Sequence, residues 1–311
     1  GIQVYAHRGG GFLSLSSSVK GADEVSEDSR MIAPFYHAEE VAERIKAPQE
    51  RARALARVAA ALARAGHADE ALAAAERIEK PQERARVLAR VAAALAQVGE
   101  TDRARQVADN AASTAGRIEA PQERARVLAG AAEALARAGH ADEALAAAER
   151  IEKPWSRARA LAGAAEALAQ VGETDWARQV ADNAASTAER IKAPQERARA
   201  LARVAEALAQ VGETDWARQV ADNAASTAER IKAPQERARA LARVAEALAQ
   251  VGETDWARQV ADNAASTAER IKAPWLRTWA LAGVAEALAQ AGVIDGALKI
   301  VSVMNDPISR S

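Results

Sequence analysis

The sequence has no cysteine among its 311 residues, and only 3% of the residues are aromatic. The first absence excludes disulfides and thiolate metal sites. The second leaves few of the large side chains that fill a thick globular core. No stretch reaches the roughly 18 consecutive apolar residues of a membrane helix, and residues 1–18 lack the pattern of a secretory signal. We therefore expect a cytoplasmic protein without a membrane partner.

The sequence also lacks an excess of charge of either sign, since 42 basic and 43 acidic residues give a formal net charge of -1. Such a chain exerts no long-range attraction on phosphates, so a nucleic-acid partner is disfavoured. The sequence contains no GxxxxGK, HExxH or paired-cysteine motif. Of the four histidines, His67 and His140 occupy the same position in two related segments, and we expect both in exposed loops. We predict no catalytic residue, metal or cofactor.

One short fragment resembles an enzyme. Residues 4–10, Val-Tyr-Ala-His-Arg-Gly-Gly, resemble the strand-end His-Arg-Gly of glycerophosphodiester phosphodiesterases. The resemblance covers about seven residues, and the sequence lacks the expected metal-binding carboxylates and the rest of the barrel. Enzymatic activity therefore ranks last among the functions considered, and the chain is predicted not to be an enzyme.

What the sequence does contain is a repeat. Residues 190–229 recur without a change at residues 230–269. Related units start at Arg44, Arg77, Arg117, Arg150, Arg190, Arg230 and Arg270, so successive spacings are 33, 40, 33, 40, 40 and 40 residues. The composition is dominated by alanine, with leucine, glutamate and arginine, which are strong helix formers. The period and composition predict an extended all-α solenoid of helix–turn–helix repeats.

Each unit is predicted to hold two helices. The first runs from Pro194 to about Val211, because proline is tolerated in a first helical turn and Gly212 can take the left-handed conformation that ends a helix. The second starts near Thr214, a candidate N-cap, and ends before the next proline. The 33- and 40-residue units differ in this second helix by seven residues. Seven residues are about two helical turns, so the buried face is nearly preserved.

These units resemble the tetratricopeptide family. That pattern has large, large, small and large residues at 0, +3, +4 and +7 of the first helix, followed by an alanine in the second. Leu201, Val204, Ala205, Leu208 and Ala217 keep this spacing. The chain departs from the family in two respects, because an alanine replaces the aromatic of the second helix and the longer unit exceeds 34 residues. The resemblance implies a right-handed superhelix, with first helices lining the concave side, that binds other proteins.

The ends of the array differ from its middle. Residues 1–34 contain a glycine- and serine-rich stretch and read as an N-terminal tail or linker. Residues 35–311 form the predicted array, with an N-terminal cap helix over 35–46. The C-terminal cap over 293–304 is bulkier than the equivalent helices, as suits a cap or a self-association surface.

Arginines recur opposite the apolar stripe of the first helices, and they are the predicted ligand-binding residues of the concave face. They are Arg53, Arg57, Arg64, Arg86, Arg90, Arg126, Arg199, Arg203, Arg239 and Arg243. In the later units Glu206 and Glu246 interrupt these stripes, whereas the first two units have no acid there. We therefore predict that the N-terminal half binds anions, and that replacing Arg57 and Arg90 by Glu abolishes this binding. The alternative is a solvated polar face.

Tryptophan recurs at a spacing of 40 in Trp176, Trp216 and Trp256. Equivalent positions elsewhere hold Glu or Arg, which argues against deep burial. We expect partial burial between units, and the alternative is a contact ladder for a partner. The favoured function is a protein- or peptide-binding scaffold that grips carboxylates with arginine. The alternatives are a self-assembling homo-oligomer and, less favoured, a nucleic-acid-binding repeat protein.

Overall fold

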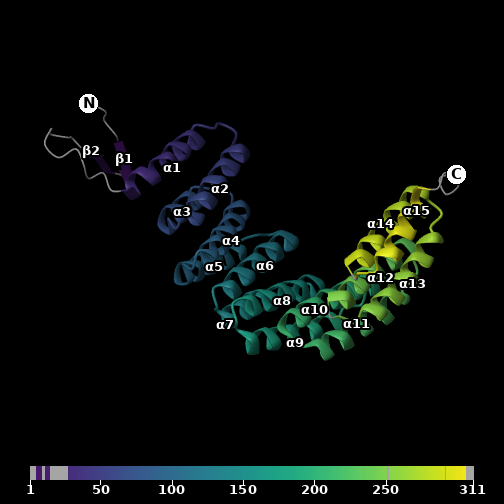
Figure 1. Cartoon of the computed structure of the whole chain (residues 1–311). Helices are drawn as coiled ribbons and strands as arrows, with labels where there is room; N and C mark the ends of the chain where they lie inside the picture. Colours follow the sequence, from purple (N-terminus) through teal and green to yellow (C-terminus); the bar gives the residue numbers. More distant parts are fainter. Residues whose placement is uncertain (1–4, 9–10, 15–26, 251, 291, 306–311) are drawn as a thin grey trace.

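The computed structural model describes residues 5–8, 11–14, 27–250, 252–290 and 292–305. Within this part a two-stranded hairpin precedes fifteen α-helices (Figure 1). The even-numbered helices are the first helices of the units: α2 (Pro48–Arg64), α4 (Pro81–Gln97), α6 (Pro121–Arg137), α8 (Pro154–Gln170), α10 (Pro194–Val211), α12 (Pro234–Gln250) and α14 (Pro274–Gln290). The second helices are α3 (Ala68–Glu76), α5 (Thr101–Ala115), α7 (Ala141–Glu149), α9 (Thr174–Glu189), α11 (Thr214–Glu229), α13 (Thr254–Glu269) and α15 (Ile294–Asn305).

The first helices begin and end where the sequence predicts. Each starts at the proline of its unit, where a missing N–H breaks no helical hydrogen bond. Gly212, after α10, has φ of 89°, a left-handed conformation that an alanine would adopt only with strain. The predicted apolar stripe is buried, including Leu201, Val204 and Leu208. The all-α repeat fold expected from the sequence is confirmed, and its handedness remains a prediction.

The second helices come in two lengths. Those of the 33-residue units, α3 and α7, have nine residues, whereas α9, α11 and α13 have sixteen. The expectation that Thr214 caps α11 is wrong. Glu213 occupies the N-cap position, Thr214 is the first helical residue, and no side chain caps the helix.

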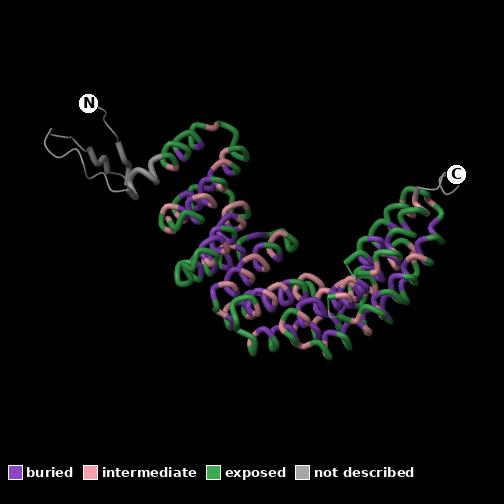
Figure 2. Tube along the Cα trace, in the orientation of Figure 1, coloured by how far each residue is buried: buried purple, intermediate pink, exposed green. Residues whose placement is uncertain are grey.

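The helices form two layers that curve along the array. Successive first helices contact one another, and each second helix contacts mainly the first helices of its own and the next unit. Figure 1 shows the first helices α8, α10, α12 and α14 on the inner side of the bend and the second helices on the outer side. Buried residues run between the two layers along the whole array (Figure 2). The first helices therefore line the concave face.

An isoleucine and an arginine join consecutive units. Ile191 follows the second helix α9, and its side chain is buried between units. Arg197, on the following first helix, donates from Nε to the Ile191 carbonyl at 2.6 Å. Equivalent contacts recur at five other units: Arg51 to Ile45, Arg124 to Ile118, Arg157 to Ile151, Arg237 to Ile231 and Arg277 to Ile271. These arginines stabilise the backbone between consecutive units, and none of them is among the predicted ligand-binding arginines.

Much of the predicted N-terminal tail lies outside the described residues, and its described parts are two strands and the start of a helix. β1 (Tyr5–Arg8) pairs antiparallel with β2 (Gly11–Ser14), so the resemblance to an enzyme falls on a hairpin. The helix α1 (Glu27–Glu43) starts eight residues before the expected cap and contains Pro34. In the described part of the chain, no helix is long and apolar enough to cross a membrane.

Candidate functional site

A groove of about 750 Å³ lies on the concave face, across four consecutive first helices. Side chains of α6, α8, α10 and α12 line it. Six of these residues are arginines: Arg126, Arg159, Arg199, Arg203, Arg239 and Arg243. Three are glutamates, Glu133, Glu166 and Glu206. The lining therefore carries an excess of positive charge in a chain whose net charge is -1.

The repeat arranges these side chains in rows that cross the helices. One position of the unit carries Arg53, Arg86, Arg126, Arg159, Arg199 and Arg239 in successive first helices. We call these residues the arginine row. One turn later, a second row contains Arg57, Arg90, Gly130, Gly163, Arg203 and Arg243. A third, glutamate row begins with Glu133, Glu166 and Glu206. Equivalent residues align because each first helix packs against the equivalent face of the one before it.

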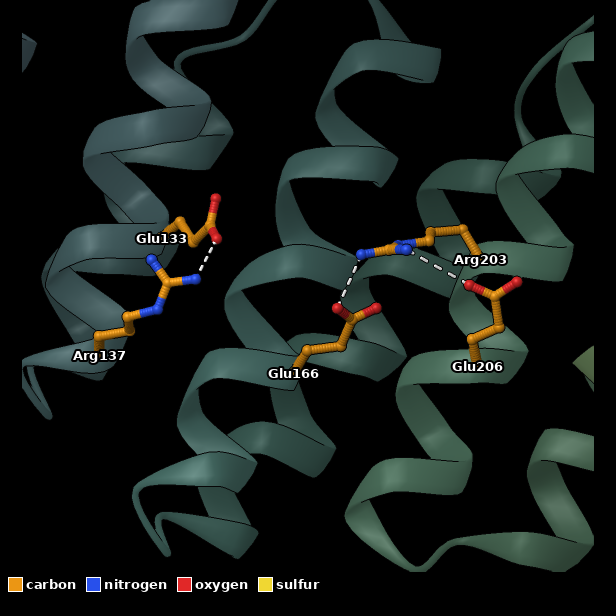
Figure 3. A network of polar contacts seen from close by, with 5 residues as sticks. All are labelled: Glu133, Arg137, Glu166, Arg203 and Glu206. Atoms are coloured by element: carbon orange, nitrogen blue, oxygen red, sulfur yellow. Dashed lines mark hydrogen bonds and ion pairs between the residues drawn. The ribbon is translucent and has the colours of Figure 1, made fainter. Parts of the chain in front are cut away.

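Ion pairs cross between neighbouring helices at the edge of the groove. Arg203 donates from Nη2 to Glu166 on α8 at 2.7 Å, and its Nη1 lies 3.4 Å from Glu206 on its own helix (Figure 3). Arg199 pairs with Glu236 on α12 at 2.5 Å. Figure 3 also shows Glu133 held by Arg137 on the same helix. These bonds fix the glutamate row and part of the arginine rows in place.

Burial raises the pKa values of two acids of the glutamate row, Glu166 and Glu206. Removal from water raises the pKa of Glu206, against the attraction of Arg203 and Arg243 and with repulsion from Glu246 and Glu166. The same cause raises the pKa of Glu166, where Arg203 acts against it and Glu133 adds to it. Glu166 is only partly satisfied, because its Oε1 is buried without a hydrogen-bond partner among the described residues.

The groove includes half of the predicted arginines. Arg126, Arg199, Arg203, Arg239 and Arg243 line it. Arg53, Arg57, Arg64, Arg86 and Arg90 lie on α2 and α4, outside the hollowed stretch. Within the described residues, Arg53, Arg57, Arg64 and Arg90 are exposed and form no ion pair. Arg86 pairs with Glu123 on α6, a partner that its own helix does not reveal.

Arg159 is a groove residue that the sequence reasoning missed. It is the member of the arginine row on α8, and the repeat alignment carries the signal for it. Its guanidinium lies 5.1 Å from the centre of the Trp155 ring, a cation–π distance. Among the described residues it forms no ion pair, so its hydrogen-bond donors face the groove without a competing carboxylate.

The tryptophan ladder lies elsewhere. Trp176, Trp216 and Trp256 sit on the second helices α9, α11 and α13, half-buried against the core. They do not line the groove. Partial burial agrees with the packing interpretation, and a role in contacting a partner stays untested.

The two equivalent histidines occupy helix starts instead of open loops. His67 and His140 are the N-cap residues of α3 and α7, and both are half-buried. Their backbone position accounts for the burial, because the following helix packs on the core. No group of three metal-ligating side chains exists among the described residues.

Comparisons with known proteins concern the fold. No family model and no curated protein matches the chain. Among solved structures, a protein from Thermococcus onnurineus NA1 is 17% identical over 91% of this chain and 96% of its own, with a TM-score of 0.36. A Rap protein complexed with competence and sporulation factor is 15% identical over 90% and 86%, with a TM-score of 0.35. A STAND protein with a tetratricopeptide repeat sensor from Pyrococcus horikoshii is 14% identical over 90% and 45%, with a TM-score of 0.36.

These similarities are low, so the fold is assigned from the chain itself. Its large, large, small and large positions are buried in each first helix, and Ala217 is buried at the start of the second. The chain is a tetratricopeptide-like α-solenoid.

Exposed large apolar side chains occur on the last two helices, α14 and α15. There Trp275 and Trp279 on α14 and Ile294, Leu298 and Val301 on α15 are exposed.

Proposed function

We propose that this solenoid is a non-enzymatic scaffold whose groove binds an acidic segment of another protein. The observation that carries the proposal is the concentration of arginine on the concave face. Six arginines and three glutamates line a single groove across α6, α8, α10 and α12. Arginine presents a planar fork of donors that matches a carboxylate, which gives the contact both energy and orientation.

The spacing of the arginine row fits an extended ligand. Adjacent packed helices lie about 8–10 Å apart, and an extended peptide advances about 3.3 Å per residue. One arginine therefore meets about every third residue of a peptide that crosses the helices. Three further arginines on α2 and α4, Arg53, Arg57 and Arg90, would extend this contact surface toward the N-terminus, where the sequence predicts anion binding.

A charge reversal in the groove tests the proposal. We expect the double variant Arg159→Glu, Arg243→Glu to weaken binding of a fluorescein-labelled poly-glutamate peptide at least about tenfold, because like charges oppose the ligand. Neither arginine has an ion pair among the described residues, so the change breaks no ion pair, and its one electrostatic effect on the glutamate row is the loss of the attraction between Arg243 and Glu206. The matched control is Arg258→Glu on α13, an exposed position of the outer layer. Unchanged affinity in the double variant would refute the groove as the binding site.

A second double variant tests the N-terminal extension. Replacing Arg57 and Arg90 by Glu should also weaken binding of the same peptide, and more so at low salt, since exposed charges are screened over about 8–10 Å at physiological ionic strength. If this variant loses all affinity while the groove variant keeps it, the site lies on α2 and α4 and not on the groove. RNA that competes better than the peptide would favour the nucleic-acid alternative.

Self-association is a second candidate function, which the C-terminal surface favours. Trp275 is 72% exposed and Leu298 is 61% exposed. The equivalent residues of the preceding unit are Gln235 and Arg258, so in the α14–α15 unit two apolar residues stand where that unit has polar ones. Large exposed apolar patches mark association surfaces. Restoring the interior residues with Trp275→Gln and Leu298→Arg should convert oligomers to monomers in light scattering, and a wild-type monomer would contradict this candidate.

A further inference from the structure

We propose that the groove selects an acidic peptide with a tyrosine or tryptophan at its centre, and that Gly130 and Gly163 are the residues that select it. The inference rests on the proposed function, because it names the ligand of the same groove. It starts from the interruption of the second row. Arg57, Arg90, Arg203 and Arg243 occupy this position on α2, α4, α10 and α12, whereas the lining helices α6 and α8, and α14 outside the groove, carry glycine.

Packing does not require these glycines. Both lie inside helices with ordinary negative φ. A Cβ placed on Gly163 would meet no atom within 4 Å, and one placed on Gly130 would touch only the Cβ of Ala89, at 3.4 Å. Glycine also weakens a helix relative to alanine. Their structural effect is the space that two absent arginine side chains leave in the middle of the groove.

The walls of this space suit a flat side chain. Small apolar residues form part of the lining beside it, namely Ala129 on α6 and Ala160 on α8. Trp155 and Arg159, also in the lining, supply a ring and a guanidinium plane. Aromatic rings stack favourably on both kinds of surface. An aromatic side chain would therefore replace water over alanine, glycine and the Arg159 plane.

On the side of the glutamate row, the groove contains a carboxylate oxygen that could accept a hydrogen bond from a ligand. Arg203 satisfies Oε2 of Glu166, while Oε1 is buried and has no partner among the described residues. A buried acceptor left unpaired is costly, so a ligand donor that pairs with it when the Glu166 side chain turns toward the groove gains affinity. The phenol of tyrosine and the indole of tryptophan each combine a ring with such a donor. A lysine also donates, but the excess of arginines in the lining repels its charge.

The test uses labelled peptides with three acidic residues on each side of a central Tyr, Phe, Ala or Lys, followed by fluorescence anisotropy at physiological ionic strength. We expect the Tyr peptide to bind wild-type protein at least about tenfold more tightly than the Ala peptide, and severalfold more tightly than the Phe peptide. In Gly163→Arg, which introduces the residue that α10 and α12 carry at this position, the Tyr and Ala peptides should bind within about twofold of each other. Gly163→Ala is the matched control and should keep the preference.

The outcomes separate the two proposals. If no peptide binds the wild-type chain, the proposed function fails. If the peptides bind the wild-type chain equally, or if Gly163→Arg keeps the Tyr preference, the selection by glycine is overturned while the acidic-peptide groove stands. Tightest binding of the Lys peptide also overturns it. Circular dichroism checks each fold, and Gly163→Gln replaces the Arg variant if that variant does not fold.

Discussion

At the scale of single residues, Glu206 is an acid placed inside an alanine-rich layer. Only 5% of its surface is exposed, and burial raises its pKa against the pull of Arg203. The folded chain therefore binds this proton more tightly than the unfolded chain does. The stability that protonation adds is present at acidic pH and is lost as pH rises from the ordinary glutamate value of 4.5 through the raised value.

We predict that Glu206→Gln stabilises the chain near neutral pH and makes its melting temperature less dependent on pH. The amide keeps the shape and removes the charge that burial opposes. Burial also raises the pKa values of four other acids, namely Glu39, Glu166, Asp182 and Asp222. Part of the dependence of the melting temperature on pH will therefore remain in the variant. Glu246→Gln, at the more exposed equivalent position, is the control. A lower melting temperature for Glu206→Gln at pH 7 would show that its bond to Arg203 outweighs burial.

The tryptophans of the outer layer give a second residue-scale prediction. Trp216 is half-buried against the core, so Trp216→Glu should lower the free energy of unfolding by about 1–3 kcal/mol, less than truncation of a fully buried ring. Denaturant titration measures this loss. Full stability combined with weaker binding of a partner would instead support the contact ladder.

The sequence predicts buried residues well but predicts ion pairs poorly. Leu201 and Leu208 are identified by helical spacing alone, because a helix fixes which residues share a face. The bond between Arg203 and Glu166 joins residues 37 positions apart. It depends on how far one helix slides along its neighbour, and no local pattern encodes that shift. The acidic partner of Arg86 was missed for the same reason.

At the scale of helices, boundaries follow proline and glycine. The predicted span from Pro194 to Val211 is observed for α10, and Gly212 takes the predicted conformation. The start of α11 was less predictable, because Glu213 precedes the helix without any side-chain hydrogen bond to favour it. The hairpin of β1 and β2 was also missed, because its glycine-rich surroundings read as a linker.

The two lengths of second helix lead to a prediction about deletions. Removing residues 181–187 from α9 leaves nine helical residues, as in α7, and rotates the following residues by only about 20°. Removing residues 181–185 rotates them by about 140° and turns the buried face outward. We expect the first variant to keep a single unfolding transition by circular dichroism. The second should lose several kcal/mol, and equal stability of the two would contradict this account of the unit lengths.

At the scale of the whole molecule, contacts are almost entirely between neighbouring units. Stability should therefore be a sum of unit and interface contributions. Chains truncated after residue 273 and after residue 233 should unfold at progressively lower denaturant concentrations while keeping the helical signal of the remaining units. Loss of all helical signal on removing α14 and α15 would rule out this additive behaviour.

The groove could be predicted only in part at this scale. The resemblance to tetratricopeptide repeats placed the first helices on the concave side, and the arginines at repeat positions followed from it. The location of the hollow did not, because it depends on how the side chains of four first helices pack together, Gly130 and Gly163 among them. The right-handed twist of the array stays a prediction, which a crystal structure would check.

The unequal contacts of the two layers have a mechanical consequence. Successive first helices touch along the inner layer, whereas the second helices bridge to them from outside. We therefore expect bending to change the spacing of the second helices more than the spacing of the first helices, which contact one another directly. The contacts between first helices would then keep the inner layer of the array nearly constant in length when the molecule bends. Its ends can swing together or apart while the distance from one arginine of the row to the next stays the same.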